Sequence, residues 1–542
     1  MVMRRPLLSS SSSLAASAAL LLWASAISAY ATTITVTTTN DSGPGSLRQA
    51  LAAANDRDTI MFAVTGSIKL VDGELFVDKS ITISGPGAHN LAVDGNASSR
   101  VFHIASGKTV SITDLKITNG IASGDRPAGQ GGGIYNDHAV LAVTNCTITS
   151  NQAGYGGGIY NDASSSGYAS LIISSSMLAG NSARFGGATY NDGFDSGDAM
   201  LTVNNSTFSG NSADFGGCIF NDSLAGNASL LSSESTFSGN SAYNTGGCIY
   251  NDIVKGYGTQ TLNSSSLTGN SAGNSGGGIY SNHGVSFTLD HCTISGNSAQ
   301  NRGGGIYNDG SQQDAAWLTI KSSTLSGNSA STGGGIFNDG EQQGDTHLQI
   351  SNSTISENTA TYGGGIASDG YNGFYVSVQI NNSTFGGNSA SNAGGGIYIV
   401  GEGSQDVSVS LANTILKTGT LGGNIFNDSG TVSSLGYNLS NDTCGGFLTG
   451  PGDQANTEPI LGPLQDNGGP TLTHALLPGS PAINTGDPNF TSPPLYDQRG
   501  PGFYRVANGR IDIGSFEAQG SMPRATPIPR PRPIAKPRPT PR

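Results

Sequence analysis

The stretch Gly131-Gly132-Gly133-Ile134-Tyr135-Asn136-Asp137 returns about every thirty residues along most of this chain. A second phrase, Ser209-Gly210-Asn211-Ser212-Ala213 in one copy, runs in step with it. A nearly fixed period of about 20 to 50 residues is typical of a solenoid or a propeller. Later copies have their central position at Ile159, Thr189, Ile219, Ile249, Ile279, Ile306, Ile336, Ile366, Ile397 and Ile425.

The apolar residues within one repeat predict short strands separated by bends. Leu201 and Val203 alternate with polar residues, which predicts a strand with one buried face. Phe208 follows five positions after Val203, and this odd step would place it on the opposite face of a straight strand. A bend must therefore intervene, and the polar Asn205-Ser206-Thr207 suits a turn. The glycine-rich phrase gives a further strand, with Ile134 and Asn136 on one face and the intervening residues on the other.

Strands that bend and return once per repeat predict an all-β fold. We expect a right-handed single-stranded parallel β-helix solenoid, in which equivalent positions stack at about the 4.8 Å strand spacing. A propeller is the alternative, but its blades need about 40 to 50 residues and four strands. Stacking would make a ladder of side-chain amides from Asn151, Asn181 and Asn211. It would also make an aromatic row, a candidate binding row, from Tyr135, Tyr160, Tyr190, Phe220, Tyr250, Tyr280, Tyr307 and Phe337.

The N-terminal residues 1–31 have the pattern of a secretory signal peptide. Two arginines precede an apolar run from Leu14 to Ile27, and Ala29-Tyr30-Ala31 offers small residues for cleavage. The mature chain would then start near Thr32, whereas an uncleaved membrane anchor is the alternative.

Residues 32–79 are expected to form an N-terminal helical cap. Ser46-Leu47-Arg48-Gln49 matches a capping box that precedes a short apolar helix. Such a helix could cover the open first rung of a solenoid, although a surface helix has the same pattern. The β-helix repeats would follow over residues 80–428.

Beyond residue 428 the repeat fails and proline becomes frequent, which marks a separate C-terminal region over residues 429–520. Its words include Ser434-Leu435-Gly436-Tyr437-Asn438-Leu439, Glu458-Pro459-Ile460-Leu461-Gly462-Pro463-Leu464, Asn467-Gly468-Gly469-Pro470-Thr471, Gly479-Ser480-Pro481-Ala482-Ile483-Asn484-Thr485-Gly486, Asp497-Gln498-Arg499-Gly500 and Asp512-Ile513-Gly514-Ser515-Phe516-Glu517. This order resembles the choice-of-anchor Q region of bacterial surface proteins. The preceding Gly-Gly-x-Ile and Gly-Asn-Ser-Ala words resemble the polymorphic outer membrane protein repeat.

The resemblance implies a pectin-lyase-like β-helix that is secreted and displayed at a cell surface or outer membrane. Residues 521–542 form a tail with eight prolines, five arginines and Lys536. An extended polyproline II conformation is expected for it. The tail would attach the protein to a cell-envelope component, or it would be a disordered end without a partner.

The charge distribution separates the tail from the body. The formal charge of −13 includes Arg4, Arg5 and the six cations of the tail, so residues 32–520 carry −21. An acidic body argues against nucleic acid as its ligand. We expect a monomer whose partner is a polysaccharide or a host or cell surface.

Two cysteines occupy equivalent positions on adjacent coils. Cys218 and Cys248 would therefore have Cα atoms near the roughly 5 Å separation that a disulfide accepts. A disulfide is one interpretation, and two small buried thiols in a stack is the other. Cys146 and Cys292 share another position but lie five coils apart, which excludes a bond between them.

The repeat stacks aspartate carboxylates on successive coils, and these are its strongest candidates for a chemical role. Neighbours about 5 Å apart repel by about 1 kcal/mol in water and more at lower dielectric. They must therefore be solvated, splayed or bridged by cations. We expect a solvated row, with Ca²⁺ bridging as the alternative and no other cofactor. The weak calcium candidates are Asp137, Asp162, Asp192, Asp222 and Asp252.

No catalytic residue is predicted. Gly269-Asn270-Ser271-Ala272-Gly273 fits a nucleophile-elbow pattern, but it is one copy of a repeated phrase. His138, His283 and His291 have no metal-ligand spacing with one another. The sequence therefore favours a non-catalytic adhesion or glycan-binding protein. The alternative is a polysaccharide lyase or glycoside hydrolase of the pectin-lyase-like class, because fold alone does not decide function.

Overall fold

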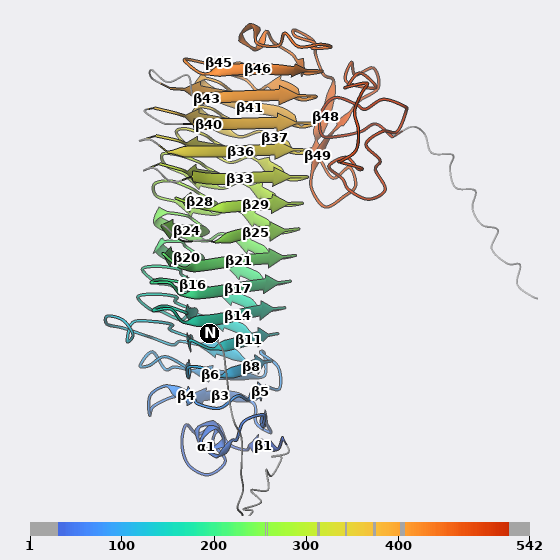
Figure 1. Ribbon diagram of the computed structural model, residues 1–542. Helices are drawn as coiled ribbons and strands as arrows, with labels where there is room; N and C mark the ends of the chain where they lie inside the picture. Colours follow the sequence, from blue (N-terminus) through green and yellow to red (C-terminus); the bar gives the residue numbers. More distant parts are fainter. Residues whose placement is uncertain are drawn as a thin grey trace, which may run out of the picture.

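The protein is a long right-handed parallel β-helix, which confirms the predicted fold class (Figure 1). The computed structural model describes residues 31–519, except 255, 257, 312–314, 342–343, 372–374 and 402–406. The tail over residues 521–542 and all of the predicted signal peptide except Ala31 lie outside the described residues. Successive coils each add one strand to three parallel sheets, called A, B and C, that run along the rod.

Sheet A contains the strands in which apolar and polar residues alternate most regularly. In spatial order its strands are β1 (Thr33–Val36), β2 (Thr59–Phe62), β5 (Thr82–Ser84), β8 (Thr109–Thr113), β11 (Val140–Thr144), β14 (Tyr168–Ser174), β17 (Asp198–Asn204), β21 (Asn227–Ser233), β25 (Thr259–Asn263), β29 (Ser286–Asp290), β33 (Ala315–Lys321), β36 (Asp345–Ser351), β40 (Tyr375–Asn381), β43 (Val407–Ala412) and β46 (Thr431–Gly436).

Sheet B follows the bend after each sheet A strand. Its strands are β3 (Gly66–Lys69), β6 (Leu91–Asp94), β9 (Lys116–Thr118), β12 (Thr147–Thr149), β15 (Met177–Ala179), β18 (Thr207–Ser209), β22 (Thr236–Ser238), β26 (Ser266–Thr268), β30 (Thr293–Ser295), β34 (Thr324–Ser326), β37 (Thr354–Ser356), β41 (Thr384–Ala393), β44 (Ile415–Thr418) and β47 (Leu439–Ser440). A short sheet D at the next corner contains β19 (Ser212–Phe215), β23 (Ser241–Thr245), β27 (Ser271–Ala272) and β31 (Ser298–Ala299), and β38 (Thr359–Tyr362) pairs with β41.

Sheet C is built from the glycine-rich phrase that defines the repeat. Its strands are β4 (Leu75–Val77), β7 (Phe102–Ile104), β10 (Ile134–Asp137), β13 (Ile159–Asp162), β16 (Thr189–Asp192), β20 (Ile219–Leu224), β24 (Ile249–Val254), β28 (Ile279–Asn282), β32 (Ile306–Asp309), β35 (Ile336–Asp339), β39 (Ile366–Asp369), β42 (Ile397–Val400) and β45 (Ile425–Asn427).

The interior of each coil is filled as the alternation predicts. Leu201 and Val203 of sheet A, Phe208 of sheet B and Ile219 of sheet C are all fully or almost fully buried. The predicted bend lies at Asn205, whose φ of 45° is in the left-handed region. This bend turns the chain so that both apolar stretches face the same core.

Two ladders of buried asparagines tie neighbouring coils together. The predicted one is confirmed, because the amide of Asn151 donates to Asn181 at 2.9 Å and that of Asn181 donates to Asn211 at 3.0 Å. A second ladder lies on sheet C, where the Asn136 amide donates to Asn161 at 2.7 Å. Buried amides that bond their equivalents on the next coil help to fix the register between coils.

Glycine at the corner before sheet C is required by close backbone packing. A Cβ on Gly132 would lie 2.4 Å from the carbonyl oxygen of Gln152 and 2.6 Å from that of Gly157 on the next coil. Any larger residue would therefore separate adjacent coils.

The stack extends beyond residues 80–428 at both ends, with β1 to β4 before it and β46 and β47 after it. The helix α1 (Leu47–Ala53) packs near β1 and β4 at the N-terminal end (Figure 1). Ser46 caps it by accepting a hydrogen bond from the backbone N–H of Gln49 at 3.2 Å. In the described part of the chain, no helix is long and apolar enough to span a membrane.

The C-terminal region leans against the outside of sheet B (Figure 1). It contains the 3-10 turn η1 (Cys444–Gly446) and the antiparallel pair β48 (Leu461–Gln465) and β49 (Thr473–Leu476). Two of its fixed words meet, because Arg499 bonds Asp497 at 2.5 Å and the carbonyl oxygen of Glu517 at 2.6 Å. Gln498 between them accepts a hydrogen bond from the Thr354 hydroxyl at 2.6 Å. These words therefore build the region and dock it on the rod.

Candidate functional site

The aromatic and carboxylate rows form one continuous seam on the outside of sheet C. Tyr135 donates its hydroxyl hydrogen to Asp162 of the next coil at 2.7 Å, and Tyr280 donates to Asp309 at 2.7 Å. The same bond joins Tyr160 to Asp192, Tyr190 to Asp222 and Tyr307 to Asp339. Each of these five tyrosines therefore satisfies the carboxyl group one coil ahead, because strand pairing places equivalent residues one coil apart.

The expectation of a solvated carboxylate row is wrong for much of the seam. Asp162 is 4 % exposed, Asp192 is fully buried and Asp339 is 2 % exposed. The loop after each strand covers the carboxyl, and its backbone donates an N–H, as Ser164 does to Asp162 at 3.0 Å. Hydrogen bonds replace water, so burial does not require a bridging cation. Calcium at Asp137, Asp162, Asp192, Asp222 or Asp252 stays a prediction.

Burial changes the protonation of the seam. It raises the pKa of Asp222 to about 7, and the neighbouring charge of Asp192 adds to the effect. Burial together with the charge of Asp309 also raises the pKa of Asp339 to about 7. A carboxyl group that loses water and faces a like charge favours its neutral form. Part of the seam is therefore protonated near neutral pH.

Two arginines neutralise the seam, and sequence reasoning missed both. Arg126 forms an ion pair with Asp192 at 2.8 Å and lies 4.7 Å above the ring centre of Tyr155. Arg302 pairs with Asp339 at 3.2 Å. Arg302 directly precedes the glycine phrase of its coil, so its position in the repeat could have revealed it. Arg126 lies in an irregular loop, and no periodic signal marks it.

An outer row of residues decides how much of the aromatic row is covered. This outer row is the residue just before the first glycine of each phrase. Tyr155, Phe185 and Phe215 occupy it in consecutive coils and stack on one another, with ring centres 5.3 and 5.4 Å apart. Their rings meet the inner rings edge-on, as Phe185 meets Phe220 at 5.4 Å. The inner rings Tyr160, Tyr190 and Phe220 are consequently buried.

The cover is interrupted in the next two coils, where Thr245 and Ser275 occupy the outer row. Each outer ring meets the inner ring of the next coil, so Thr245 leaves Tyr280 without an aromatic cover, and Tyr280 and its neighbour Tyr250 are only half-buried. They stack nearly parallel, with centres 4.9 Å apart, and Tyr280 stacks on Tyr307 at 4.7 Å. The predicted aromatic binding row is therefore internal packing over most of its length and accessible only at this interruption.

The interruption opens a cavity of about 460 Å³, which we call the notch. One wall is aromatic and the other is polar, a combination suited to ligands with both apolar faces and hydroxyl groups. The amide of Asn301 donates to Asn274 at 2.7 Å in the polar wall. The notch is lined by Thr245, Asn274, Ser275, Tyr280, Asn301, Arg302, Tyr307, Ser331 and Thr332.

A larger cavity of about 650 Å³ lies between the rod and the C-terminal region. Its lining includes Asn352, Asn413 and Phe490. The amide of Asn352 already donates to the carbonyl oxygen of Tyr496 at 3.3 Å, and that of Asn413 to Asp512 at 3.0 Å. These amides hold the C-terminal region in place, so the notch is the better candidate for a ligand.

The cysteine pair lies inside the rod. Cys218 and Cys248 are fully buried, and the backbone N–H of Cys218 donates to the carbonyl oxygen of Cys248 at 2.9 Å. All five cysteines are free thiols in the structure. The predicted disulfide is therefore not formed here and stays a prediction for an oxidised state.

A polar cluster occupies the N-terminal end of the seam. Glu74 pairs with Arg100 at 2.6 Å and with His103 at 3.0 Å. Burial opposes charge on His103, but its bonds to Asp137 and Glu74 outweigh burial and raise the pKa of His103. This cluster joins the seam at Asp137, where His138 also bonds.

One short segment of the chain matches a known repeat family. A model of the Chlamydia polymorphic membrane protein (Chlamydia_PMP) repeat matches residues 291–309. A search of the curated proteins found no match. Several solved structures are similar to the chain at low sequence identity.

Three of these solved structures are polysaccharide-modifying enzymes. The A-module of a mannuronan C-5 epimerase from Azotobacter vinelandii is 14 % identical, with 74 % of this chain and 97 % of that chain covered and a TM-score of 0.36. A pectate lyase is 13 % identical, with 90 % and 96 % covered and a TM-score of 0.30. A PL6 family alginate lyase is 13 % identical, with 74 % and 53 % covered and a TM-score of 0.36. These similarities concern the course of the backbone and not the chemistry of the seam.

Proposed function

We propose that this protein binds glycans at the notch without cleaving them. The observation that carries the proposal is the stacked pair Tyr250 and Tyr280, which stay partly exposed where Thr245 and Ser275 occupy the outer row. Flat aromatic faces pack against the apolar face of a sugar ring, and nearby amides and a guanidinium bond its hydroxyl groups. Asn274, Asn301 and Arg302 supply those groups.

The proposal places the protein at a bacterial surface. The match to a polymorphic membrane protein repeat supports this location, and so does the signal-peptide pattern of residues 1–31. The resemblance of residues 429–520 to a choice-of-anchor Q region agrees with a surface role. The basic tail would bind an acidic envelope component, and the rod would act as a monomer.

The test is retention and cleavage of plant and microbial polysaccharides by the purified protein. We expect retention of at least one glycan and cleavage of none. Tyr280→Ala should weaken retention about tenfold, which corresponds to about 1.4 kcal/mol. Trp317→Ala is the matched control, because it removes an exposed ring from sheet A and should leave retention unchanged. Equal loss in both variants would contradict a site at the notch.

A polysaccharide lyase or glycoside hydrolase is the second candidate function, and one observation favours it. Asp339, with its pKa raised to about 7, forms an ion pair with Arg302, which lines the notch. A carboxyl group with such a pKa is suited to general acid or base catalysis. Turnover of any polysaccharide that Asp339→Asn abolishes would favour this candidate over simple binding.

A further inference from the structure

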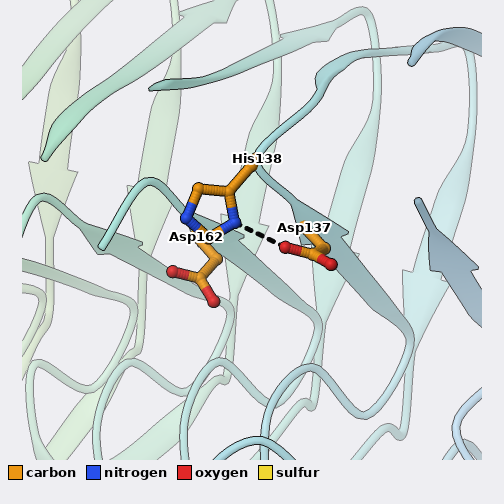
Figure 2. A group of neighbouring side chains, drawn as sticks. All are labelled: Asp137, His138 and Asp162. Atoms are coloured by element: carbon orange, nitrogen blue, oxygen red, sulfur yellow. Dashed lines mark hydrogen bonds and ion pairs between the residues drawn. The ribbon is translucent and has the colours of Figure 1, made fainter. Parts of the chain in front are cut away.

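We propose that Asp137, His138 and Asp162 form a binding site for a divalent transition-metal ion of the zinc class (Figure 2). Asp137 and Asp162 are the last residues of the paired strands β10 and β13, and His138 follows Asp137 directly. One ligand atom from each side chain lies within 4.8 Å of the other two. Strand pairing therefore brings together residues whose sequence spacing gives no metal motif.

The hydrogen bonds of His138 fix its tautomer. Its Nε2 lies 2.8 Å from the carbonyl oxygen of Ser164. A carbonyl oxygen only accepts hydrogen bonds, so Nε2 must carry the hydrogen. Nδ1 then points its lone pair at the Asp137 carboxylate, 2.5 Å away (Figure 2). At this distance a proton shared in a hydrogen bond joins the two atoms, and a metal ion bound by both would replace that proton.

The neighbouring groups orient the ligands as they do in metal sites. A metal-binding histidine usually donates its other ring N–H to a backbone carbonyl or a carboxylate, as His138 does to Ser164. Asp162 accepts from the Tyr135 hydroxyl at 2.7 Å and from the Ser164 N–H at 3.0 Å. Gly167 packs closely on the imidazole, because a Cβ there would lie 2.0 Å from Cδ2 of His138. The side chains are thus held before any ion binds.

The donor set selects the kind of ion. One imidazole and two carboxylates suit zinc and related ions, whereas Ca²⁺ takes six to eight oxygen ligands. Ligand atoms about 2.1 Å from a tetrahedral ion lie about 3.4 Å apart. His138 and Asp137, which are 2.5 Å apart, would therefore have to separate by about 0.9 Å to hold such an ion. Asp137 and His138 are each 28 % exposed, so an ion could enter from solvent.

Two other histidines of the chain lack the full set. His283 occupies the equivalent position several coils later, but Asn282 stands there in place of Asp137. His291 contacts Asp290 at 2.7 Å, but no third ligand joins them within the part of the chain that the structure describes. The Asp290 and His291 pair is therefore a natural control for a histidine beside one carboxylate.

The test is a calorimetric titration of the chelator-treated full chain with ZnCl₂, repeated with MnCl₂ and CaCl₂. We expect one zinc ion per chain, with Ca²⁺ bound at least tenfold more weakly. His138→Ala and Asp137→Asn should each weaken zinc binding by more than the roughly 10- to 100-fold that loss of an orienting partner causes. His291→Ala should stay within twofold of the parent chain. Circular dichroism would verify that each variant is folded.

A second readout separates binding from misfolding. Zinc should raise the melting temperature of the parent chain and of His291→Ala, but not of folded His138→Ala. Absence of saturable zinc binding would overturn the proposal and leave a protonated His138 paired with Asp137. Equal zinc affinity in His138→Ala and the parent chain would overturn it as well.

Discussion

The seam on sheet C is closed around Tyr190 and open around Tyr280, although both residues occupy the same position of the repeat. Around Tyr190 the outer row is aromatic, and Arg126 reaches over it to Asp192. Around Tyr280 the outer row is Ser275. The inner ring is core in the first case and part of a cavity in the second. One outer-row residue per coil therefore decides whether this face stabilises the rod or is available to a ligand.

Removing the aromatic cover should have the largest effect on stability. Phe185 stacks between Tyr155 and Phe215, so Phe185→Ala should lower the free energy of unfolding by about 3 kcal/mol. Ser275→Ala at the equivalent position of the open coil should cost less than about 0.5 kcal/mol. Denaturant unfolding followed by circular dichroism measures both. If both variants lost a similar free energy of unfolding, the aromatic cover would not stabilise the closed coil more than the open one.

Raising the pH should weaken the closed part of the seam. Because the pKa of Asp222 is raised to about 7, the folded protein holds a proton that the unfolded chain releases near pH 4. This contribution to stability is full below about pH 4 and is lost as the pH rises to about 7. The slope is at most about 1.4 kcal/mol per pH unit for one proton, or about 2 kcal/mol between pH 5 and 7.

Asp222→Asn should flatten this pH dependence, since an amide does not titrate there. Asp198→Asn, at an exposed carboxyl group, is the control and should leave the slope unchanged. Melting temperatures across the pH range provide the measurement. An unchanged slope in Asp222→Asn would show that the group ionises normally in the folded chain.

Removing the guanidinium of Arg126 should have an intermediate effect on stability. Arg126→Gln leaves the buried Asp192 without its ion pair, a change that costs about 3 to 5 kcal/mol at fully buried sites. Arg126 is 35 % exposed, and solvent screening reduces the expected cost to about 1 to 2 kcal/mol. Arg184→Gln is the control, because Arg184 is exposed and contacts only a ring face, that of Phe185 at 5.1 Å. Chemical denaturation of both variants would show whether Arg126→Gln lowers the free energy of unfolding more than Arg184→Gln does.

Extending the cover into the open coil should produce the smallest change in stability and a clear loss of binding. Thr245→Phe would place a ring next to Phe215 and over Tyr280, as Phe215 lies over Tyr250 one coil earlier. An added aromatic pair should stabilise the rod by about 1 kcal/mol. If the notch binds glycans, the same variant should weaken retention about tenfold. Thr332→Ala, at the far edge of the notch, should have little effect on stability.

Much of the rod could be predicted because the same interactions recur at equivalent positions of successive repeats. The step from Val203 to Phe208 required a bend, and the left-handed φ of Asn205 provides it. The ladder of Asn151 and Asn181 followed from stacking and is present. The solvated carboxylate row was not correct, because the Tyr160 hydroxyl and the following loop cover Asp192. That outcome depends on atoms from a neighbouring coil, which a single repeat does not reveal.

The sequence by itself determined the coil, its interior and its register. The coil is specified by alternating apolar residues, glycines at the corners and buried asparagines. These features contact their equivalents in the adjacent coils, so the sequence of one repeat specifies how the next repeat stacks on it. Only the tertiary structure decided which outward-facing side chains are accessible, which carboxyl groups are protonated and which residues meet at His138. These properties depend on contacts across coils and on irregular loops such as that of Arg126. Such contacts have no fixed spacing along the chain, and so they appear only when the coils are stacked.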